Sequence, residues 1–279
     1  MMQAQGSLSV ERMCLLAGLS RATFYRLLRR QDRPMADQEL RHSIQKICLR
    51  HRRYGYRRVR RHLKRDGMAV GDRRLLRLMR EDNLLAIRKK GYVNRPSSQT
   101  TAAFPNLLLQ AEATGPDQVW VADITYIRLQ KEFVFLAVVL DRYTRRVVGW
   151  HLDRKMDISL TLTALRQALL ARQPRPGLIH HSDRGIQYAC QTYCRELMDH
   201  KILGSMSAAG NPYDNAVCES FMSTLKKEEI YCREYENLEQ LRQSLEDFIE
   251  RYYNRVRMHS ALGYRAPAEY EAEIMATSA

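Results

Sequence analysis

Three consecutive β-prone runs, followed by an alternation of helical stretches and short β-prone runs, constrain the fold of this chain more than any other feature of its sequence. Three strands in succession favour an antiparallel meander, and the alternation after them favours parallel additions to the same sheet. The order βββαβαβ therefore predicts an α/β domain over residues 117–275, with helices at its end. In chain order the stretches are 119–127, 133–140, 147–152, 158–172 (helical), 177–181, 188–200 (helical), 202–206, 215–230 (helical) and 238–253 (helical).

Positive charge is concentrated in the first third of the chain. Up to Pro96 there are 25 Lys and Arg against 8 Asp and Glu, whereas the remainder has 21 against 23. The whole excess of +15 therefore lies before the α/β domain. Such a concentration indicates a polyanionic partner, and nucleic acid fits better than a membrane surface because no aromatic-rich amphipathic face accompanies the charges.

The first basic unit, residues 1–34, has the pattern of a helix-turn-helix. Apolar residues recur at helical spacing from residue 10 to 28, and Gly18 and Ser20 interrupt them as a turn and a helix cap. The second helix would present Arg21 and Arg26 to a DNA groove. A plain helical hairpin remains the alternative.

A second basic helical unit is predicted over residues 35–90. The turn at residues 54–56 precedes a basic helix at 57–65, and Asp72 is positioned to cap a further helix at 73–81. Arginines on the outer sides of these helices suit phosphates and guanine edges. The candidate DNA-binding residues in this unit are Arg57, Arg58, Arg61, Arg73, Arg74 and Arg77.

Between the basic units and the α/β domain, residues 91–116 form a polar, proline-containing linker. No apolar run is long enough for a transmembrane helix, and the N-terminus has no secretion signal. The six cysteines form no CxxC pair, which favours reduced thiols over a zinc site. These features predict a cytoplasmic protein that does not contact a membrane.

Three carboxylates stand out in the α/β domain. Asp123 interrupts an apolar β-prone run, where a charge is costly unless it binds something. Asp183 follows another such run, and Glu219 lies near the start of a helix. Taken singly, each could be an ordinary solvated or turn-forming carboxylate, Glu219 above all. Displacement at phosphorus by two divalent ions, Mg²⁺ or Mn²⁺, needs at least three carboxylates brought together as oxygen ligands.

The spacing of these residues resembles a known family. Asp183 and Glu219 have 35 residues between them, which, with Asp123 upstream, is similar to the DDE core of retroviral integrases and integrase-like transposases. Further segments resemble the second reading-frame product (OrfB) of the IS-three family of bacterial insertion sequences, and the resemblance covers most of residues 37–271. Those segments are Tyr54 to Arg58, Trp120 to Tyr126, His181 to Gly185, Asn211 to Ala216, Glu219 to Phe221, and Tyr253 to Tyr264.

The resemblance implies a ribonuclease-H-like (integrase core) catalytic domain, preceded by all-α helix-turn-helix domains. Asp123, Asp183 and Glu219 become ligands of two Mg²⁺ or Mn²⁺ ions. Lys226 would contact DNA near the active site. His181 and Asn215 would orient the ligands from behind. Arg257 and His259 would either touch DNA or brace the core.

The implied activity is DNA transposition: binding of terminal repeats in double-stranded DNA, strand cleavage, and joining to target DNA. Holding two ends together implies a homo-oligomer, at least a dimer, associated with the bacterial nucleoid. The family also implies a longer form fused to, or associated with, an upstream reading-frame product. One departure is the stretch from Asn106 to Ala113, which is neutral to acidic where the family is commonly basic and aromatic.

Three other functions fit parts of the pattern. A non-catalytic DNA-binding regulator would use the basic front and keep the α/β domain for assembly, but it would not need all three carboxylates. A retroviral-type integrase would carry a zinc-binding His/Cys front, which this sequence lacks. A ribonuclease H proper would not need two helix-turn-helix units.

Overall fold

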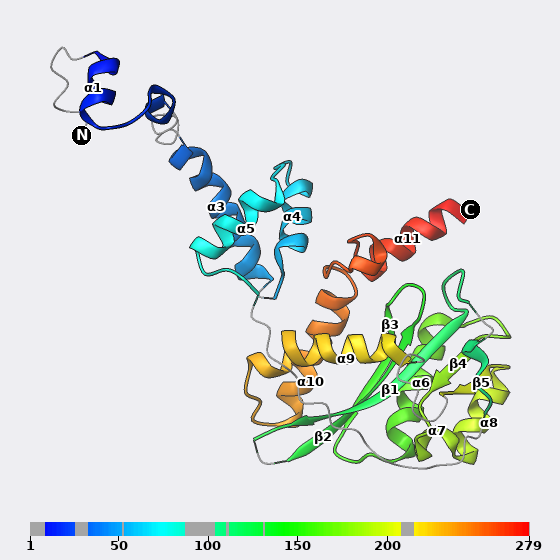
Figure 1. Ribbon diagram of the computed structural model, residues 1–279. Helices are drawn as coiled ribbons and strands as arrows, with labels where there is room; N and C mark the ends of the chain where they lie inside the picture. Colours follow the sequence, from blue (N-terminus) through cyan, green and yellow to red (C-terminus); the bar gives the residue numbers. More distant parts are fainter. Residues whose placement is uncertain are drawn as a thin grey trace. The chain divides into compact units, whose positions relative to one another are not determined.

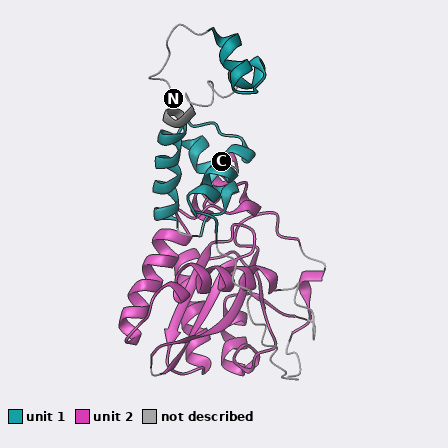
Figure 2. Cartoon of the chain, turned by 60° about the vertical axis from the view of Figure 1, so that its left-hand side comes forward, with its two compact units in different colours: residues 1–89 teal, residues 90–279 magenta. Residues whose placement is uncertain are grey.

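The computed structural model describes residues 9–25, 33–51, 53–86, 104–109, 112–130, 132–207 and 215–278. The chain divides into two compact units, residues 1–89 and 90–279, which are coloured separately in Figure 2.

The first unit is helical throughout its described residues. Helix α1 (Val10–Leu16) begins after Ser9, whose hydroxyl accepts a hydrogen bond from a backbone N–H of the first turn, and it ends before Gly18, where φ is +62°. Residues 21–25 are helical again, and Ser20 Oγ accepts from the Thr23 N–H at 3.1 Å. The predicted helix, glycine turn and serine cap are confirmed as far as Tyr25; Arg26 lies outside the described residues.

Three longer helices follow in this unit: α3 (Arg33–Arg50), α4 (Tyr56–Arg65) and α5 (Asp72–Glu81). The prediction that Asp72 caps α5 was wrong. The cap position is Gly71, and the Asp72 carboxylate instead accepts from Arg60 Nη1 at 2.6 Å. The helices pack through one apolar cluster, whose buried members are Leu40, Ile44, Ile47, Val59, Leu63, Leu75, Leu78 and Met79.

The second unit contains a five-stranded sheet in the order β3-β2-β1-β4-β5 (Figure 1). Strands β1 to β3 form an antiparallel meander, and β4 and β5 extend the sheet in parallel, as the sequence predicted. Strand β1 is therefore the central one. The strands are β1 (Val119–Arg128), β2 (Phe133–Asp141), β3 (Val147–Asp153), β4 (Ile179–Ser182) and β5 (Leu203–Met206).

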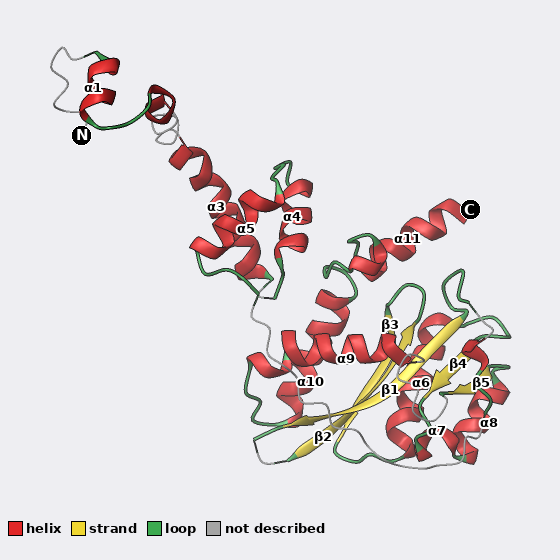
Figure 3. Ribbon diagram, in the orientation of Figure 1, coloured by secondary structure: helices red, strands yellow, loops and turns green. Residues whose placement is uncertain are grey.

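Helices cover both faces of this sheet (Figure 3). Side chains alternate between the faces along a strand: Val119 and Val121 of β1 pack with the C-terminal helices, whereas Trp120 and Ala122 pack with the helices between β3 and β5. The second group comprises α6 (Ile158–Arg172), α7 (Ile186–Ala189) and α8 (Gln191–Asp199). The first comprises α9 (Ala216–Glu228), η4 (Ile230–Cys232), α10 (Leu238–Glu246) and the π-helix η5 (Asp247–Tyr253).

Two close approaches complete the packing of the sheet. Gly149 on β3 lets α6 come so near that a Cβ there would lie 2.3 Å from the Ala164 carbonyl oxygen. At the other edge, the Phe104 ring lies against Gly204 of β5, and the segment continues into η2 (Leu107–Leu109). This part of the predicted linker therefore covers the edge strand.

The chain ends in η6 (Ser260–Leu262) and α11 (Pro267–Ser278). Within the described ranges, no helix has both the length and the apolar character that crossing a membrane requires.

Candidate active site

Two of the three predicted carboxylates lie just beyond the paired part of two neighbouring strands. Strands β1 and β4 pair in parallel, with Val121 opposite His181. Continuing this register by two residues places Asp123 opposite Asp183, which directly follows the last residue of β4. Opposite residues in parallel strands point to the same face. The sheet itself therefore brings these two carboxylates together from positions 60 residues apart.

The third carboxylate belongs to the helix that covers this face. Helix α9 packs on the sheet through buried side chains that include Cys218 and Phe221. Glu219 lies between them in sequence and is exposed, as is Asp183, whereas Asp123 is half-buried. The apolar stripe of α9 thus fixes the helix on the sheet and leaves Glu219 at its solvent-facing side.

The electrostatics of this face show crowded negative charge. Burial, followed by the charge of Asp183 and then that of Glu219, raises the pKa of Asp123 to about 7, against the lowering effect of the Ile124 N–H and Lys226. The Ile124 N–H donates to Asp123 Oδ1 at 2.8 Å. Burial of its carboxyl also raises the pKa of Asp183, although the Gly185 N–H donates to it at 2.9 Å. Ionisation of both Asp123 and Asp183 is therefore unfavourable unless a cation binds between them.

The donors on this face are carboxylate oxygens, the ligands that Mg²⁺ and Mn²⁺ prefer. Among the side chains that the structure describes, however, no three from His, Cys, Asp and Glu are gathered tightly enough to form a complete metal cluster. The chemistry of the donor set fits a divalent ion, while the register of the sheet brings only two of the three together directly.

Lys226 lies beside these carboxylates. It is half-buried, and its charge lowers the pKa of Asp123, while burial lowers the pKa of Lys226 itself. Its Nζ lies 4.9 Å from the ring centroid of Tyr126. The sequence patterns do not single out Tyr126, because strand alternation places it on the opposite face from Asp123.

The two residues predicted to orient the ligands are buried and tied to neighbouring strands. His181 Nδ1 lies 2.8 Å from Ser205 Oγ, and its Nε2 lies 3.1 Å from Ser207 Oγ, so the ring links β4 to the strand beside it. Asn215 Nδ2 donates to the Ala122 carbonyl at 3.3 Å. These contacts hold the chain two residues before Asp183 and directly before Asp123.

Comparison with known proteins identifies the family of the chain. Residues 113–212 and 200–267 match family models described as "Integrase core domain", and residues 35–92 match one described as "HTH-like domain". The chain is 34% identical to the transposase InsF for insertion sequence IS3A of Escherichia coli (strain K12), over 98% of this chain and 97% of that one. It is 36% identical to the transposase for insertion sequence element IS904 of Lactococcus lactis subsp. lactis (strain IL1403), over 87% and 98%.

The chain belongs to the IS-three family of insertion-sequence transposases. It is also 38% identical to an uncharacterized 31 kDa protein of insertion element IS600 from Shigella sonnei, over 92% of this chain and 97% of that one. Among solved structures it is similar to a simian T-cell lymphotropic virus intasome in complex with PP2A regulatory subunit B56 gamma, with a TM-score of 0.49, 15% identity, and coverage of 82% and 74%. The HTLV-2 integrase catalytic core in complex with magnesium gives a TM-score of 0.44, 17% identity, and coverage of 57% and 99%.

In the helical front of this transposase, the candidate DNA-binding arginines differ in their surroundings. Arg74 donates to Asp37 Oδ1 at 2.7 and 2.9 Å, and Arg77 donates to the other oxygen of the same carboxylate at 3.0 Å. The Arg58 guanidinium lies over the Tyr54 ring, 5.5 Å from its centroid. The remaining candidate DNA-binding residues all have exposed side chains: Arg21, Arg57, Arg61 and Arg73.

The C-terminal family segment braces the core. Arg257 is 4% exposed and forms a bidentate ion pair with Glu228 of α9, at 2.7 and 2.9 Å. Asn254 accepts from the Val147 N–H and donates to its carbonyl, both at 3.0 Å. Of the two roles that the sequence left open for Arg257, the structural one is the role that these contacts favour.

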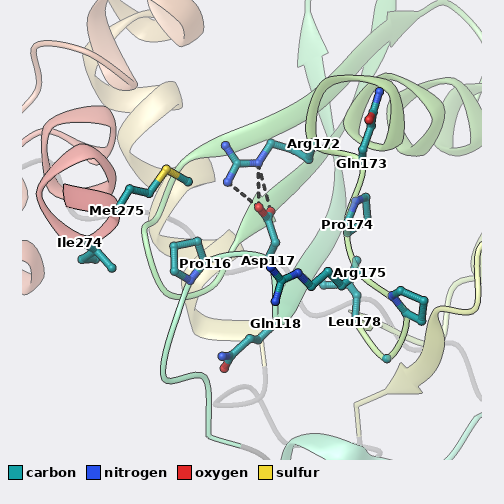
Figure 4. A pocket seen from close by; sticks show the side chains of 12 residues that line it. Pro116, Asp117, Gln118, Arg172, Gln173, Pro174, Arg175, Leu178, Ile274 and Met275 are labelled. Atoms are coloured by element: carbon teal, nitrogen blue, oxygen red, sulfur yellow. Dashed lines mark hydrogen bonds and ion pairs between the residues drawn. The ribbon is translucent and has the colours of Figure 1, made fainter. Parts of the chain in front are cut away.

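A cavity of about 580 Å³ lies at the other end of the parallel strands from Asp183, near the start of β1 and the loop before β4 (Figure 4). Its lining includes Arg172, which binds the Asp117 carboxylate at 2.6 Å and also pairs with Glu271 of α11. Two carboxylates thus compensate Arg172, and the cavity is separate from the carboxylates of the candidate active site.

Proposed function

We propose that this chain is a DDE transposase that binds the terminal repeats of its insertion sequence, cleaves DNA strands at those ends, and joins them to target DNA. The observation that carries the proposal is the parallel pairing of β1 with β4, which ends two residues before Asp123 and two residues before Asp183, on a sheet covered by the helix that bears Glu219. Membership of a transposase family supplies the substrate class.

Asp123, Asp183 and Glu219 would hold the divalent ions, Mg²⁺ or Mn²⁺, two per active site. When bound, such ions activate an attacking oxygen and stabilise the leaving oxygen in an in-line displacement at phosphorus. Glu219, exposed on α9, would turn toward the two aspartates when the site is loaded. The pKa of Asp123, which burial first and then the charges of Asp183 and Glu219 raise to about 7, supports the proposal because a bound cation would offset these effects.

The neighbouring residues would position the ligands and the DNA. His181 holds the backbone before Asp183 through its two serine partners, and Asn215 holds the backbone before Asp123. Lys226 would bind a phosphate next to the cleaved bond. His181 and Asn215 would thereby keep Asp123 and Asp183 in place during both chemical steps.

The helical front would bind double-stranded DNA at the element ends. Two ends have to be held together, so the active form would be at least a dimer, alone or with an upstream reading-frame product. The bacterial relatives suggest chromosomal DNA of the nucleoid, in the cytoplasm, as the place of action.

The test is a cleavage and joining assay on a duplex that carries the DNA end flanking the gene. Asp123→Asn, Asp183→Asn and Glu219→Gln should each lower strand cleavage by at least about a hundredfold while end binding stays near that of the wild type. Asp199→Asn, at the exposed end of α8, is the matched control and should cleave normally. Chelation of divalent ions should abolish both steps.

Two results would decide against the proposal. Full cleavage by any of the three variants would remove that residue from the catalytic set. End binding by the wild type without cleavage in Mg²⁺ or Mn²⁺ would instead favour a non-catalytic DNA-binding regulator.

A further inference from the structure

Two large aromatic side chains lie exposed beyond the candidate active site, near the hairpin that joins β1 to β2. Tyr126 is 52% exposed and Phe133 is 53% exposed. Their ring centroids are 5.9 Å apart, with an angle of 74° between the ring planes. Together they present a contiguous apolar surface to solvent, which is a feature that proteins tend to keep for binding.

Each of these rings has a cation beside it. Lys226 Nζ lies 4.9 Å from the centroid of Tyr126, and Arg128 Cζ lies 5.9 Å from that of Phe133. We call Tyr126, Phe133, Arg128 and Lys226 the aromatic platform. Aromatic faces interleaved with positive charge suit a ligand that has both flat bases and phosphates, because stacking and charge attraction then act together.

The ends of the strands explain why the aromatic platform is open. The described pairing of β1 with β4 stops at Val121 and His181, and β4 ends at Ser182. From Ile124 onward, the described residues place a strand beside β1 on its β2 side alone. Lys226 of α9 can therefore reach past this edge to Tyr126, although α9 covers the other face of the sheet.

The aromatic platform is also close to the carboxylates. Tyr126 follows Asp123 by three residues in one strand, which corresponds to about 10 Å. Because Tyr126 points to the opposite face of β1, a strand bound at Asp123 would reach it by turning around the open edge of β1, where Lys226 is near both residues. A fully paired duplex hides its base faces, whereas an unpaired nucleotide offers one.

We propose that the aromatic platform stacks an unpaired nucleobase of the DNA strand whose phosphate is bound at Asp123 and Asp183, and that Lys226 and Arg128 bind the phosphates on either side of it. This inference rests on the proposed function and adds a position at which the DNA end is held open. Tyr126 and Phe133 would then bind a base next to the cleaved bond.

The test compares two DNA probes that share the sequence of the element end. One is fully paired, and the other ends in a short single-stranded overhang that carries 2-aminopurine, whose fluorescence is quenched by stacking. The wild type should bind the overhang probe more tightly and quench its fluorescence. Tyr126→Ala and Phe133→Ala should each weaken overhang binding by about tenfold and remove the quenching, with binding of the paired probe within twofold of wild type.

The controls separate stacking from folding. Tyr126→Phe keeps the ring and should behave as the wild type, whereas Tyr126→Leu keeps the apolar bulk without a flat face and should behave as Tyr126→Ala. Tyr231→Ala removes another exposed aromatic side chain of the same unit and should change neither probe. Thermal unfolding of each variant shows whether it is folded.

Equal binding of both probes by the wild type, or normal quenching by Tyr126→Leu, would overturn the stacking proposal. These results differ from a failure of the proposed function. In that case the wild type would cleave no DNA with Mg²⁺ or Mn²⁺, whatever the probes show, whereas a false stacking proposal leaves cleavage intact and dependent on Asp183.

Discussion

The helical front and the integrase core differ in how their charged side chains are arranged. In the front, where the positive excess of the chain is concentrated, several arginines are bound by acidic residues of the same unit, as Arg74 and Arg77 are by Asp37. On the face of the core that α9 covers, burial and then the charges of Asp183 and Glu219 raise the pKa of Asp123 to about 7. The helical front partly compensates its positive charge with its own acidic residues, whereas the core places negative charges close together.

This difference shows what each region can bind. A surface of partly compensated arginines attracts a polyanion along its whole length, and each contact contributes little on its own. A crowded group of carboxylates gains much from one small cation at one place. The front is therefore suited to finding and holding DNA, and the core to a local reaction on it.

The largest effect is expected where the core buries an ion pair completely. Replacing Arg257 by Ala would leave the Glu228 carboxylate buried without its cation at the end of α9, so the free energy of unfolding should fall by about 3–5 kcal/mol. Urea unfolding followed by circular dichroism measures it. The double variant Arg257→Met with Glu228→Leu should recover much of the loss, because neither charge then remains. A loss of under about 1 kcal/mol would mean that Arg257 is not structural and is available to DNA.

A smaller effect is expected from the crowded carboxylates. Since the pKa of Asp123 is raised in the folded state from its ordinary 3.8 to about 7, the folded protein holds this proton more tightly than the unfolded chain. The stability that the proton confers is present below pH 4 and is lost as the pH rises to about 7. In metal-free buffer, Asp123→Asn should lack this loss and gain about 2–4 kcal/mol relative to the wild type between pH 4 and pH 8.

Denaturant unfolding of both proteins across that pH range measures the difference. Asp199→Asn is again the matched control, and it should follow the wild type. Parallel stability curves for the wild type and Asp123→Asn would contradict the crowding of charge on which the comparison rests.

The smallest effects are expected in the front. Arg73 is exposed and has no ion pair among the described residues, whereas its neighbour Arg74 is bound by Asp37. Arg73→Ala should weaken binding of the end duplex by a few-fold and reduce the slope of log affinity against log salt by about 1. Arg74→Ala should change both less. Fluorescence anisotropy at several salt concentrations compares them, and a larger effect from Arg74 would show that Asp37 releases it to DNA.

Much of the core was predictable from its sequence because local patterns determine it. The apolar, β-prone run of β1 and the helical spacing of apolar residues in α6 predicted these two elements, and the order of the sheet follows from such elements. The pairing of Asp123 with Asp183 required the register of two strands far apart in sequence. That register is a tertiary property, and only the resemblance to a family suggested it beforehand.

Other features could not be predicted, for reasons that particular residues show. Asp72 was expected to cap α5, but a long-range partner, Arg60, binds its carboxylate instead. Arginine is a common DNA-binding residue, so the sequence left Arg257 two roles, contact with DNA or support of the core. Only its burial against Glu228 favours the second. Tyr126 points to the other face of β1 from Asp123, and Lys226 reaches it only because β4 is short.

The central claim is that Asp123, Asp183 and Glu219 bind divalent ions together. Titration of the chain with Mn²⁺ in the presence of end DNA, with free Mn²⁺ followed by electron paramagnetic resonance, tests it most directly. We expect Asp123→Asn, Asp183→Asn and Glu219→Gln each to weaken binding by at least about tenfold, and Asp199→Asn to bind normally. Wild-type affinity should fall below pH 7 as Asp123 takes up its proton. Binding of Mn²⁺ by all three variants with wild-type affinity would contradict it.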